Sequence, residues 1–315
     1  MSGFTALKGA SYACFSPDKR YFYSTCRIDG KGGLAAFKVQ RNGDLKLLNI
    51  VESHGRSACH VEVTPDGKLI FVANYFTGNF IAFKLCKDGH IGKECYEICH
   101  EGSGPNHERQ TSAHVHMCKL TPDAKYLSVM DLGCDSIFTY AMDENWDVLD
   151  EHVTINLIEP EGSGPRHIVF KSNGKDAYLV NELLNTVMFL KYHDGKFDIL
   201  QTLSTIPDDF TAFTKAAAIR LSPDEKYVYA SNRGHDSIAV FKIGRTGKLK
   251  RAAIVSSNGI SPRDFNFLPD GKHLIMTNEN TDNALVYKWN PKDGSIAPTE
   301  WEVKIKHPLN VVVLQ

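Results

Sequence analysis

Apolar positions along the chain come in short runs separated by polar turns, and the same arrangement returns six times. In each unit, a short apolar strand is followed by a turn of the Pro-Asp-Gly-Lys type and a second apolar strand that ends in Asn or Asp. The turns lie at Ser16–Lys19, Thr64–Lys68, Thr121–Lys125, Lys171–Lys175, Ser222–Lys226 and Leu268–Lys272. Their second residues are 48, 57, 50, 51 and 46 positions apart. A period near 50 residues is typical of a repeat architecture.

Each unit predicts four strands, and the turn residues Pro, Asp, Asn and Gly separate them as tight hairpins require. In the fourth unit the expected strands are Arg166–Phe170, Ala177–Asn181, Val187–Tyr192 and Phe197–Leu203. The pattern predicts no amphipathic helix longer than two turns. Four short strands repeated at this period are typical of the blades of a β-propeller, whose radial closure hides the sheet edges. We therefore expect an all-β fold with residues 1–315 in a single propeller domain.

The end of the chain predicts part of a seventh unit. Pro308–Val313 aligns with Pro165–Phe170, so it should form a first strand. The remaining strands should come from the N-terminus, where only Phe4–Lys8 precedes the first full unit. The expected fold is a seven-bladed β-propeller, and either its seventh blade lacks two strands or the start of the chain is incomplete.

Composition narrows the class of protein and of partner. Apolar residues make up 42% of the chain, and the formal net charge of -1 argues against nucleic acid or an anionic membrane as the main partner. No stretch approaches the 18 apolar residues of a membrane span, and Met1–Cys14 lacks the pattern of a signal peptide. Eight scattered cysteines favour free thiols in a reducing cytoplasm. The oligomeric state is not determined at this level.

When the six units are aligned with one another, two positions of the repeat, called columns here, contain charged residues and histidine in several units. Because the strands of a hairpin are antiparallel, the start of strand one and the end of strand two lie at the same end of the sheet. The first column includes His116, Arg166 and Arg263, and the second, after the Asn or Asp that ends strand two, includes Arg27, Glu182, Arg233 and Glu279. Such a group of arginines favours an anionic ligand. The alternative is a set of solvated turn residues that form surface ion pairs.

The Asn and Asp residues that end strand two form a third column, which we interpret as structural. Such side chains hydrogen-bond to nearby backbone at strand ends. The members are Asn74, Asp131, Asn181, Asn232 and Asn278.

The step of 57 residues contains an insertion, Glu101–Gln110, directly before His114. The Glu-Gly-Ser-Gly-Pro sequence that opens it recurs at Glu161–Pro165, where the strand follows at once. A polar loop at this end of the sheet, with Arg109 in it, is either a substrate contact or an ordinary surface loop.

Metal binding finds little support. His114 and His116 would point to the same face of a strand, but two imidazoles are too few ligands for a metal site and no third is specified. Cys95 and Cys99 have loose spacing and no second pair. We expect ordinary thiols, no metal and no cofactor.

Several of these segments together resemble one family. They are Arg109-Gln110 before His114-Val115-His116, Asp131–Asp135, Gly164-Pro165-Arg166-His167, Asn181-Glu182, Asn232-Arg233-Gly234 and Ser261-Pro262-Arg263. The pattern resembles the seven-bladed propeller lactonases, the family of the bacterial propeller-type 6-phosphogluconolactonase, which has a fungal carboxy-muconate cyclase as a relative. The resemblance runs from about Ser11 to the C-terminus. The departure is at the N-terminus, where members of the family have an extra strand pair.

The resemblance implies hydrolysis of 6-phosphogluconolactone to 6-phosphogluconate, a step of the oxidative pentose phosphate pathway. A histidine, two arginines and a glutamate of the family's site fall on His116 (less well on His114), Arg166, Arg233 and Glu182. We expect His116 to act as general base, with Glu182 as the alternative base or as the residue that orients the water.

Binding roles complete this hypothesis. Arg166 would face the developing oxyanion. Arg233 and Arg263 would hold the phosphate, together with Arg27 or Arg109. His114 and Glu279 complete the set of expected substrate contacts.

Two other functions remain open from the sequence. One is a lactonase or cyclase that acts on another anionic lactone, such as a muconolactone, because arginines suit any anion. The other is a non-catalytic propeller that binds protein partners, since a fold does not determine a function.

Overall fold

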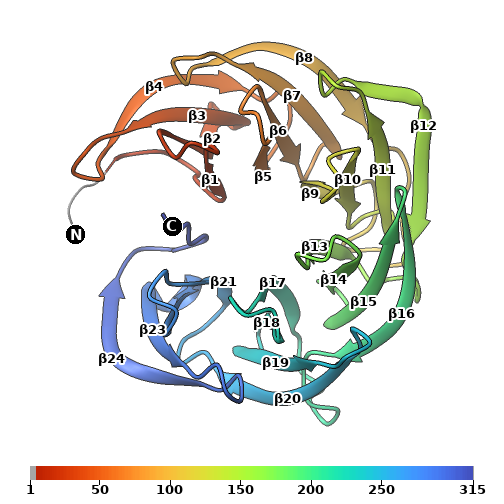
Figure 1. Ribbon diagram of the computed structural model, residues 1–315, viewed down its shortest axis with the longest axis vertical. Helices are drawn as coiled ribbons and strands as arrows, with labels where there is room; N and C mark the ends of the chain where they lie inside the picture. Colours follow the sequence, from red (N-terminus) through yellow and green to blue (C-terminus); the bar gives the residue numbers. More distant parts are fainter. Residues whose placement is uncertain (1–4, 315) are drawn as a thin grey trace. The chain divides into compact units, whose positions relative to one another are not determined.

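Six four-stranded sheets make up the computed structural model, which describes residues 5–314 apart from the side chains of residues 150–152 (Figure 1). In the first three sheets the strands are β1 (Ala13–Phe15), β2 (Tyr21–Ile28), β3 (Lys31–Val39), β4 (Leu45–Glu52), β5 (Ala58–Val63), β6 (Leu69–Asn74), β7 (Asn79–Leu85), β8 (Ile91–Cys99), β9 (Val115–Leu120), β10 (Tyr126–Asp131), β11 (Ser136–Met142) and β12 (Val148–Leu157).

In the other three sheets they are β13 (Pro165–Phe170), β14 (Asp176–Asn181), β15 (Thr186–His193), β16 (Lys196–Ser204), β17 (Lys215–Leu221), β18 (Tyr227–Arg233), β19 (Ser237–Ile243), β20 (Leu249–Ser256), β21 (Pro262–Phe267), β22 (His273–Asn278), β23 (Asn283–Trp289) and β24 (Ile296–Lys304). The one helix of the described residues is the short 3-10 turn η1 (Glu279–Thr281). The four strands expected in the fourth unit are confirmed as β13–β16, with ends that differ by at most one residue. The all-β prediction is therefore confirmed.

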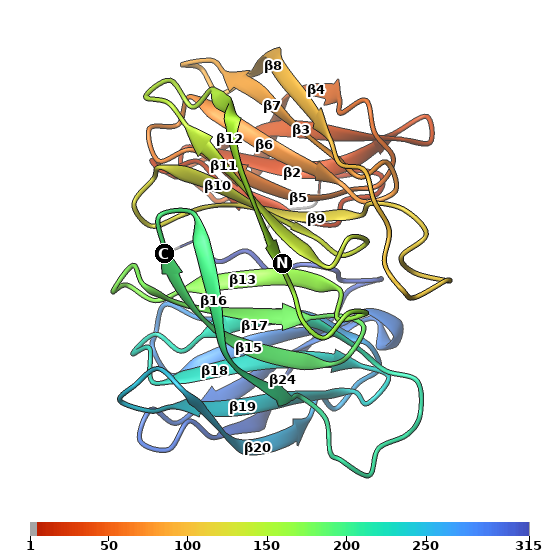
Figure 2. The same cartoon turned by 90° about the vertical axis from the view of Figure 1, so that its right-hand side faces the viewer.

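Two compact units divide the chain, and the boundary falls inside β12, between Ile155 and Asn156. Each unit contains sheets whose strands follow one another in chain order, as Figure 2 shows for β17, β18, β19 and β20. The expectation of a single domain over residues 1–315 stays a prediction.

Apolar packing between neighbouring sheets forms the core of each unit. In the first unit, Phe71 and Phe80 pack with Val129 and Tyr140 of the following sheet. The middle strands are buried on both faces, and β6 and β14 are buried along their whole length. A strand in that position reads as a continuous apolar run rather than an alternating one, which explains the sequence Leu-Ile-Phe-Val-Ala of β6.

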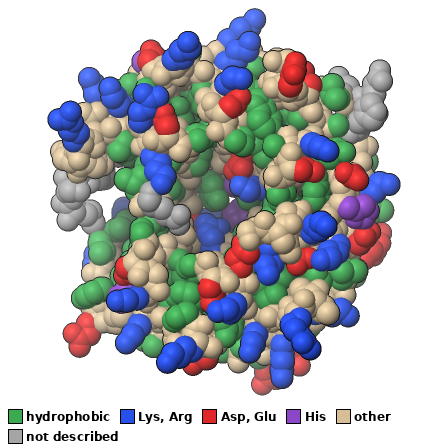
Figure 3. Space-filling model, in the orientation of Figure 1, with side chains coloured by type: hydrophobic (Ala, Val, Ile, Leu, Met, Phe, Trp, Pro, Cys, Tyr) green, Lys and Arg blue, Asp and Glu red, His purple; other side chains and the backbone are tan. Residues whose placement is uncertain are grey.

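Charged side chains lie mainly outside these cores. Figure 3 shows Lys and Arg interspersed with Asp and Glu over the visible surface, which agrees with the net charge of -1. Within residues 5–314, no helix has the length and apolar character needed to cross a membrane.

The expected seventh unit is not formed as strands. Residues 308–314 form no strand, so the prediction of a strand at Pro308–Val313 is wrong. The tail instead runs beside β21, where the backbone N–H of Val311 donates to Asp264 Oδ2 (3.0 Å) and Asn266 Nδ2 donates to the carbonyl of Val311 (3.2 Å). Bonds to side chains replace the backbone ladder that a strand needs.

The N-terminal segment also forms no strand within its described part. Phe4 lies outside the described residues, and residues 5–12 form no strand. Here Arg27 donates its backbone N–H to the carbonyl of Lys8 (2.7 Å). The segment therefore bonds to β2 of the first sheet.

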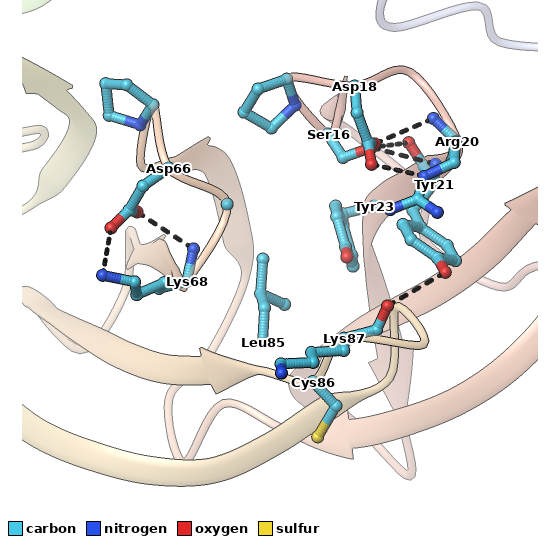
Figure 4. Close-up of a pocket in the computed structure, with 13 residues that line it drawn as sticks. Ser16, Asp18, Arg20, Tyr21, Tyr23, Asp66, Lys68, Leu85, Cys86 and Lys87 are labelled. Carbon is cyan, nitrogen blue, oxygen red and sulfur yellow. Dashed lines mark hydrogen bonds and ion pairs between the residues drawn. The ribbon is translucent and has the colours of Figure 1, made fainter.

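The Pro-Asp-Gly-Lys turns are held by their own side chains. In the second unit of the repeat, Thr64 Oγ1 donates to Asp66 Oδ1 (2.7 Å), and so does the backbone N–H of Lys68 (3.1 Å). Figure 4 shows this turn beside that of Ser16 and Asp18, across a pocket of about 520 Å³. Burial raises the pKa of Asp66, but the hydrogen bonds outweigh this effect and lower it to about 2.

This turn should contribute to stability only above acidic pH. Because the pKa of Asp66 falls from 3.8 to about 2 on folding, its contribution is complete above about pH 4 and is lost as the pH falls toward 2. We expect Asp66→Asn to lower the free energy of unfolding at pH 7 and to have a much smaller effect at pH 2. Urea unfolding at both pH values measures this. An equal difference at both pH values would contradict the prediction.

Candidate functional site

The first column of candidate residues sits on a β-bulge that recurs from sheet to sheet. In β13, Pro165 pairs with Asn181 and His167 with Val180, so Arg166 is the extra residue. The same shift leaves Cys59, His116 and Arg263 as the extra residues of β5, β9 and β21. A bulge changes the direction of the side chain relative to a regular strand. These side chains are therefore set apart from the alternating core pattern.

The second column lies directly beside the bulge within each sheet. The backbone N–H of Glu182 donates to the carbonyl of Gly164 (2.7 Å), and that of Glu279 donates to Ser261 (3.0 Å). The acceptor in each case is two residues before the bulged arginine. The antiparallel hairpins thus place the two columns at the same end of each sheet, as the sequence predicted.

A buried ion-pair cluster occupies this end of the second unit. Arg166 Nε and Arg233 Nη2 both donate to Glu182 Oε2, at 2.9 and 2.8 Å. All three side chains are at most 5% exposed. We call these three residues the Arg-Glu-Arg cluster. Charge-assisted bonds in such surroundings hold the guanidinium groups in one geometry.

Backbone carbonyls of β17 complete the binding of both arginines. Arg166 Nη1 donates to the carbonyl of Ala217 (2.7 Å), and Arg233 Nη2 donates to that of Ala216 (2.8 Å). Both alanines are fully buried. Small side chains at the bulge of β17 leave the space beside these carbonyls to the two guanidinium groups.

Burial makes the charged form of Arg233 less favourable. Desolvation lowers the pKa of Arg233, and the positive charge of Arg263 adds to this effect, while Glu182 opposes it. Within the described residues, Arg233 Nε has no hydrogen-bond partner. An arginine in a protein still remains charged at neutral pH, so the cluster retains two cations around one anion.

Arg263 and Glu279 form a looser, partly exposed pair in the same unit. Arg263 Nη1 lies 3.6 Å from Glu279 Oε2, and the two side chains are 25% and 26% exposed. Ser261 Oγ donates to the same carboxylate oxygen (3.2 Å). Because Arg263 influences the pKa of Arg233, the pair is electrostatically coupled to the Arg-Glu-Arg cluster.

In the first unit, Tyr75 is the centre of the candidate residues. Its ring stacks on His114 at 4.4 Å and meets the edge of His116 at 5.7 Å. Its hydroxyl accepts a hydrogen bond from Arg109 Nη2 (3.0 Å). The insertion loop Glu101–Gln110 is thereby attached to the two histidines through one tyrosine. This arrangement supports the interpretation of the loop as part of the site.

Arg27 lies elsewhere in the first unit. It is exposed and lines an open pocket of about 540 Å³ whose other lining residues are Ala6, Leu7, Lys8, Cys26, Ile28, Asp29, Gly30 and Ile50. None of these belongs to the group around Tyr75. The structure thus groups Arg109, His114 and His116 and leaves Arg27 apart from them.

Sequence reasoning did not select two residues that the structure places in these groups. Tyr75 follows Asn74, so it occupies the position of its unit that Glu182 and Arg233 occupy in theirs. This alignment is the only signal in the sequence that points to it. His167 follows Arg166, and its two ring nitrogens lie 3.2 and 3.3 Å from Arg166 Nη1. His167 therefore contacts the guanidinium group of Arg166 directly.

A possible metal-binding group of the described residues lies outside both sets. His54, Glu94 and Glu97 bring ligand atoms within 4.8 Å of one another, and two of the three residues are exposed. His114 instead places Nδ1 2.9 Å from the carbonyl of Tyr75.

Comparisons with known proteins give a consistent result. A family described as "Lactonase, 7-bladed beta-propeller" matches residues 1–313. The 6-phosphogluconolactonase of Bacillus subtilis is 36% identical over 312 residues, which cover 98% of this chain and 88% of that protein.

Solved structures of similar proteins superpose over nearly the whole chain. A protein from Lactobacillus plantarum superposes with a TM-score of 0.91 at 34% identity, covering 97% of this chain and 88% of the other. The periplasmic gluconolactonase of Pseudomonas aeruginosa superposes with a TM-score of 0.88 at 29% identity, covering 95% and 86%.

Proposed function

The chain belongs to the seven-bladed β-propeller lactonases, and from this premise we propose that it hydrolyses 6-phosphogluconolactone to 6-phosphogluconate in the oxidative pentose phosphate pathway. It is a lactonase, a hydrolase of cyclic esters. The proposal concerns the substrate and the residues that act on it.

The observation that carries the proposal is the Arg-Glu-Arg cluster with Arg263 beside it. Three guanidinium groups face two carboxylates, those of Glu182 and Glu279, so the five charges sum to +1. An excess of positive charge on two buried guanidinium groups and one partly exposed group suits a substrate that is anionic or becomes anionic during the reaction. The 6-phosphogluconolactonase of B. subtilis, at 36% identity, is named for such a substrate.

The reaction needs three contributions from the protein. Water adds to the lactone carbonyl, and the resulting tetrahedral intermediate carries a negative oxygen. The bond between this carbon and the ring oxygen then breaks, and the ring oxygen takes a proton, which yields the hydroxy acid. A base must accept a proton from the water, a donor must stabilise the oxyanion, and further groups must hold the substrate.

We assign these contributions as follows. Arg166, fixed by Glu182 and by the carbonyl of Ala217, stabilises the oxyanion without reorganisation. Arg233 and Arg263 bind the phosphate, and His116 is the general base. Glu182 is less suited to accept a proton, because two charged donors already occupy its Oε2.

A second candidate substrate is the same lactone without its phosphate. The observation that favours it is the pairing of all three arginines with carboxylates, which reduces the charge left for a phosphate. The gluconolactonase of P. aeruginosa, at 29% identity, is named for that substrate.

The deciding experiment compares kcat/KM for 6-phosphogluconolactone and glucono-1,5-lactone, with the uncatalysed rate subtracted. We expect the phosphorylated lactone to be preferred at least about tenfold, since one hydrogen bond to a charged group contributes about 1.5–3 kcal/mol. Arg263→Ala should reduce this preference, because Arg263 is the most exposed arginine of the group. A preference for the unphosphorylated lactone would support the second candidate. Activity on neither would leave another anionic lactone or a binding role.

We also propose a cytoplasmic location. All eight cysteines are free thiols in the structure, and a reducing compartment keeps thiols in that state.

A further inference from the structure

One connection between neighbouring sheets differs from two others that share a common pair of hydrogen bonds. The residue after the fourth strand of a sheet meets the polar residue that ends strand two of the next sheet. Ser53 Oγ donates to Asn74 Oδ1 (2.8 Å), and Asn74 Nδ2 donates back to the carbonyl of Ser53 (3.0 Å). Thr205 and Asn232 form the same pair of bonds, at 2.6 and 2.9 Å. The structural role expected for these asparagines is thus confirmed for both.

At the sheet β9–β12, this pair is replaced by His100 and Asp131. His100 Nδ1 lies 2.7 Å from Asp131 Oδ2, and Tyr140 Oη lies 2.8 Å from His100 Nε2. The side chains of His100 and Asp131 are 1% and 0% exposed. A carboxylate can only accept, so the network assigns a donating N–H to Nδ1.

The other oxygen of Asp131 serves backbone rather than a side chain. Asp131 Oδ1 accepts the N–H groups of His114 (2.8 Å), Gly133 (2.9 Å) and Cys134 (3.1 Å). An asparagine has a single side-chain oxygen, and in the Ser53–Asn74 and Thr205–Asn232 pairs a hydroxyl group donates to it. The carboxylate of Asp131 has two oxygens, so it can bond to His100 through Oδ2 and hold the backbone of His114 through Oδ1.

The position of His114 is in turn transmitted to the candidate site. His114 lies two residues before His116 and stacks on Tyr75, which accepts the hydrogen bond from Arg109. The only step of the repeat that is lengthened to 57 residues ends at this sheet. The His100–Asp131 pair therefore occurs at the sheet that follows the insertion, where Asp131 bonds to the backbone of His114.

We propose that His100, Asp131 and Tyr140 form a positioning network for His114 and His116. The carboxylate of Asp131 fixes the backbone of His114, and the buried imidazole and phenol orient the carboxylate. This inference rests on the proposed function for its kinetic consequence. Its structural consequence is that the backbone amides at the end of the insertion loop exchange hydrogen slowly. This exchange can be measured without any substrate.

The test replaces the pair by the one found at the preceding sheet. The double variant His100→Ser/Asp131→Asn supplies the residue types of the Ser53–Asn74 pair, so we expect it to fold, with a lower thermal transition because the buried imidazole is lost. The amides of residues 101–116 should exchange hydrogen faster than in the wild type. We expect kcat to fall between about tenfold and 10²-fold, as for a small misplacement of a reacting group, with KM little changed.

A conservative variant provides the control. In His100→Asn, the amide nitrogen can replace Nδ1 as the donor to Asp131, so loop protection and kcat should remain close to those of the wild type. In His100→Leu this donor is lost, and both should fall.

The outcomes separate the two proposals. Wild-type protection and kcat in a folded double variant would overturn the positioning role. If the double variant does not fold, equal losses in His100→Asn and His100→Leu would overturn it, whereas a loss in His100→Leu alone would support it. If the wild type hydrolyses neither lactone, the proposed function fails, and hydrogen exchange alone decides the positioning role.

Discussion

Replacing Arg166 by alanine is expected to lower kcat for lactone hydrolysis by about 10²- to 10³-fold, the effect of removing one donor to an oxyanion. Arg166 is held by Glu182 and by the carbonyl of Ala217, at 2.9 and 2.7 Å. Its guanidinium group is therefore in place before the substrate binds. Steady-state kinetics with 6-phosphogluconolactone, after subtraction of the uncatalysed rate, measure the loss.

Arg166→Lys separates geometry from charge. A lysine keeps the positive charge, but it has a single nitrogen where Arg166 uses both Nε and Nη1. We expect it to lose nearly as much activity as Arg166→Ala. Full activity of Arg166→Lys would show that charge alone suffices.

Arg220→Ala is the matched control for the loss of a paired arginine. Arg220 also belongs to the second unit and pairs with a buried carboxylate, that of Asp264, at 2.8 Å. It lies outside both columns of candidate residues. We expect this variant to lose stability and to keep kcat. A comparable loss of kcat in both alanine variants would contradict the role given to Arg166.

The second large effect concerns stability. Glu182→Gln should lower the free energy of unfolding by about 3 kcal/mol, because removing one partner of a buried ion pair leaves the other charge uncompensated. Here two guanidinium groups, those of Arg166 and Arg233, would lose the same carboxylate charge. Chemical denaturation followed by tryptophan fluorescence measures the difference.

Glu279→Gln is the control for that variant. Its pair with Arg263 is longer, at 3.6 Å, and about a quarter of each side chain is exposed. An ion pair accessible to solvent contributes about 0–1 kcal/mol, so the two substitutions should differ clearly. Equal effects would mean that the Arg-Glu-Arg cluster is hydrated rather than dry.

Much of the fold could be predicted from the chain because its signals are local. The turn from Lys171 to Lys175 and the apolar runs on either side of it predict β13 and β14 to within one residue at each end. Hairpins depend on residues that are close in sequence, so six repetitions of the pattern led to six sheets. The tail Pro308–Val313 has the same local pattern and still forms no strand, since a strand also needs a neighbour to pair with.

The candidate site could be predicted in part. The two columns followed from the antiparallel direction of the strands, and they selected Arg166, Glu182 and Arg233 before any contact was known. The columns did not indicate that Arg166 and Arg233 would both donate to Glu182 Oε2. They also gave Arg27 the same status as these residues, although Arg27 is exposed beside the N-terminal segment.

The sequence by itself thus determined the all-β class, the six units and the end of each sheet at which the charged residues gather, because period, turn chemistry and strand direction are local properties. The tertiary structure decided which side chains meet. A bulge at Arg166 changes the direction of its side chain. The tyrosine Tyr75, from a neighbouring sheet, joins His114 to Arg109. The histidine His100, 31 residues before Asp131, bonds to one oxygen of its carboxylate, and the other oxygen holds the backbone of His114. The contacts of the tyrosine and of the histidine join residues more than 30 positions apart in the chain, and no local pattern encodes the distance between them.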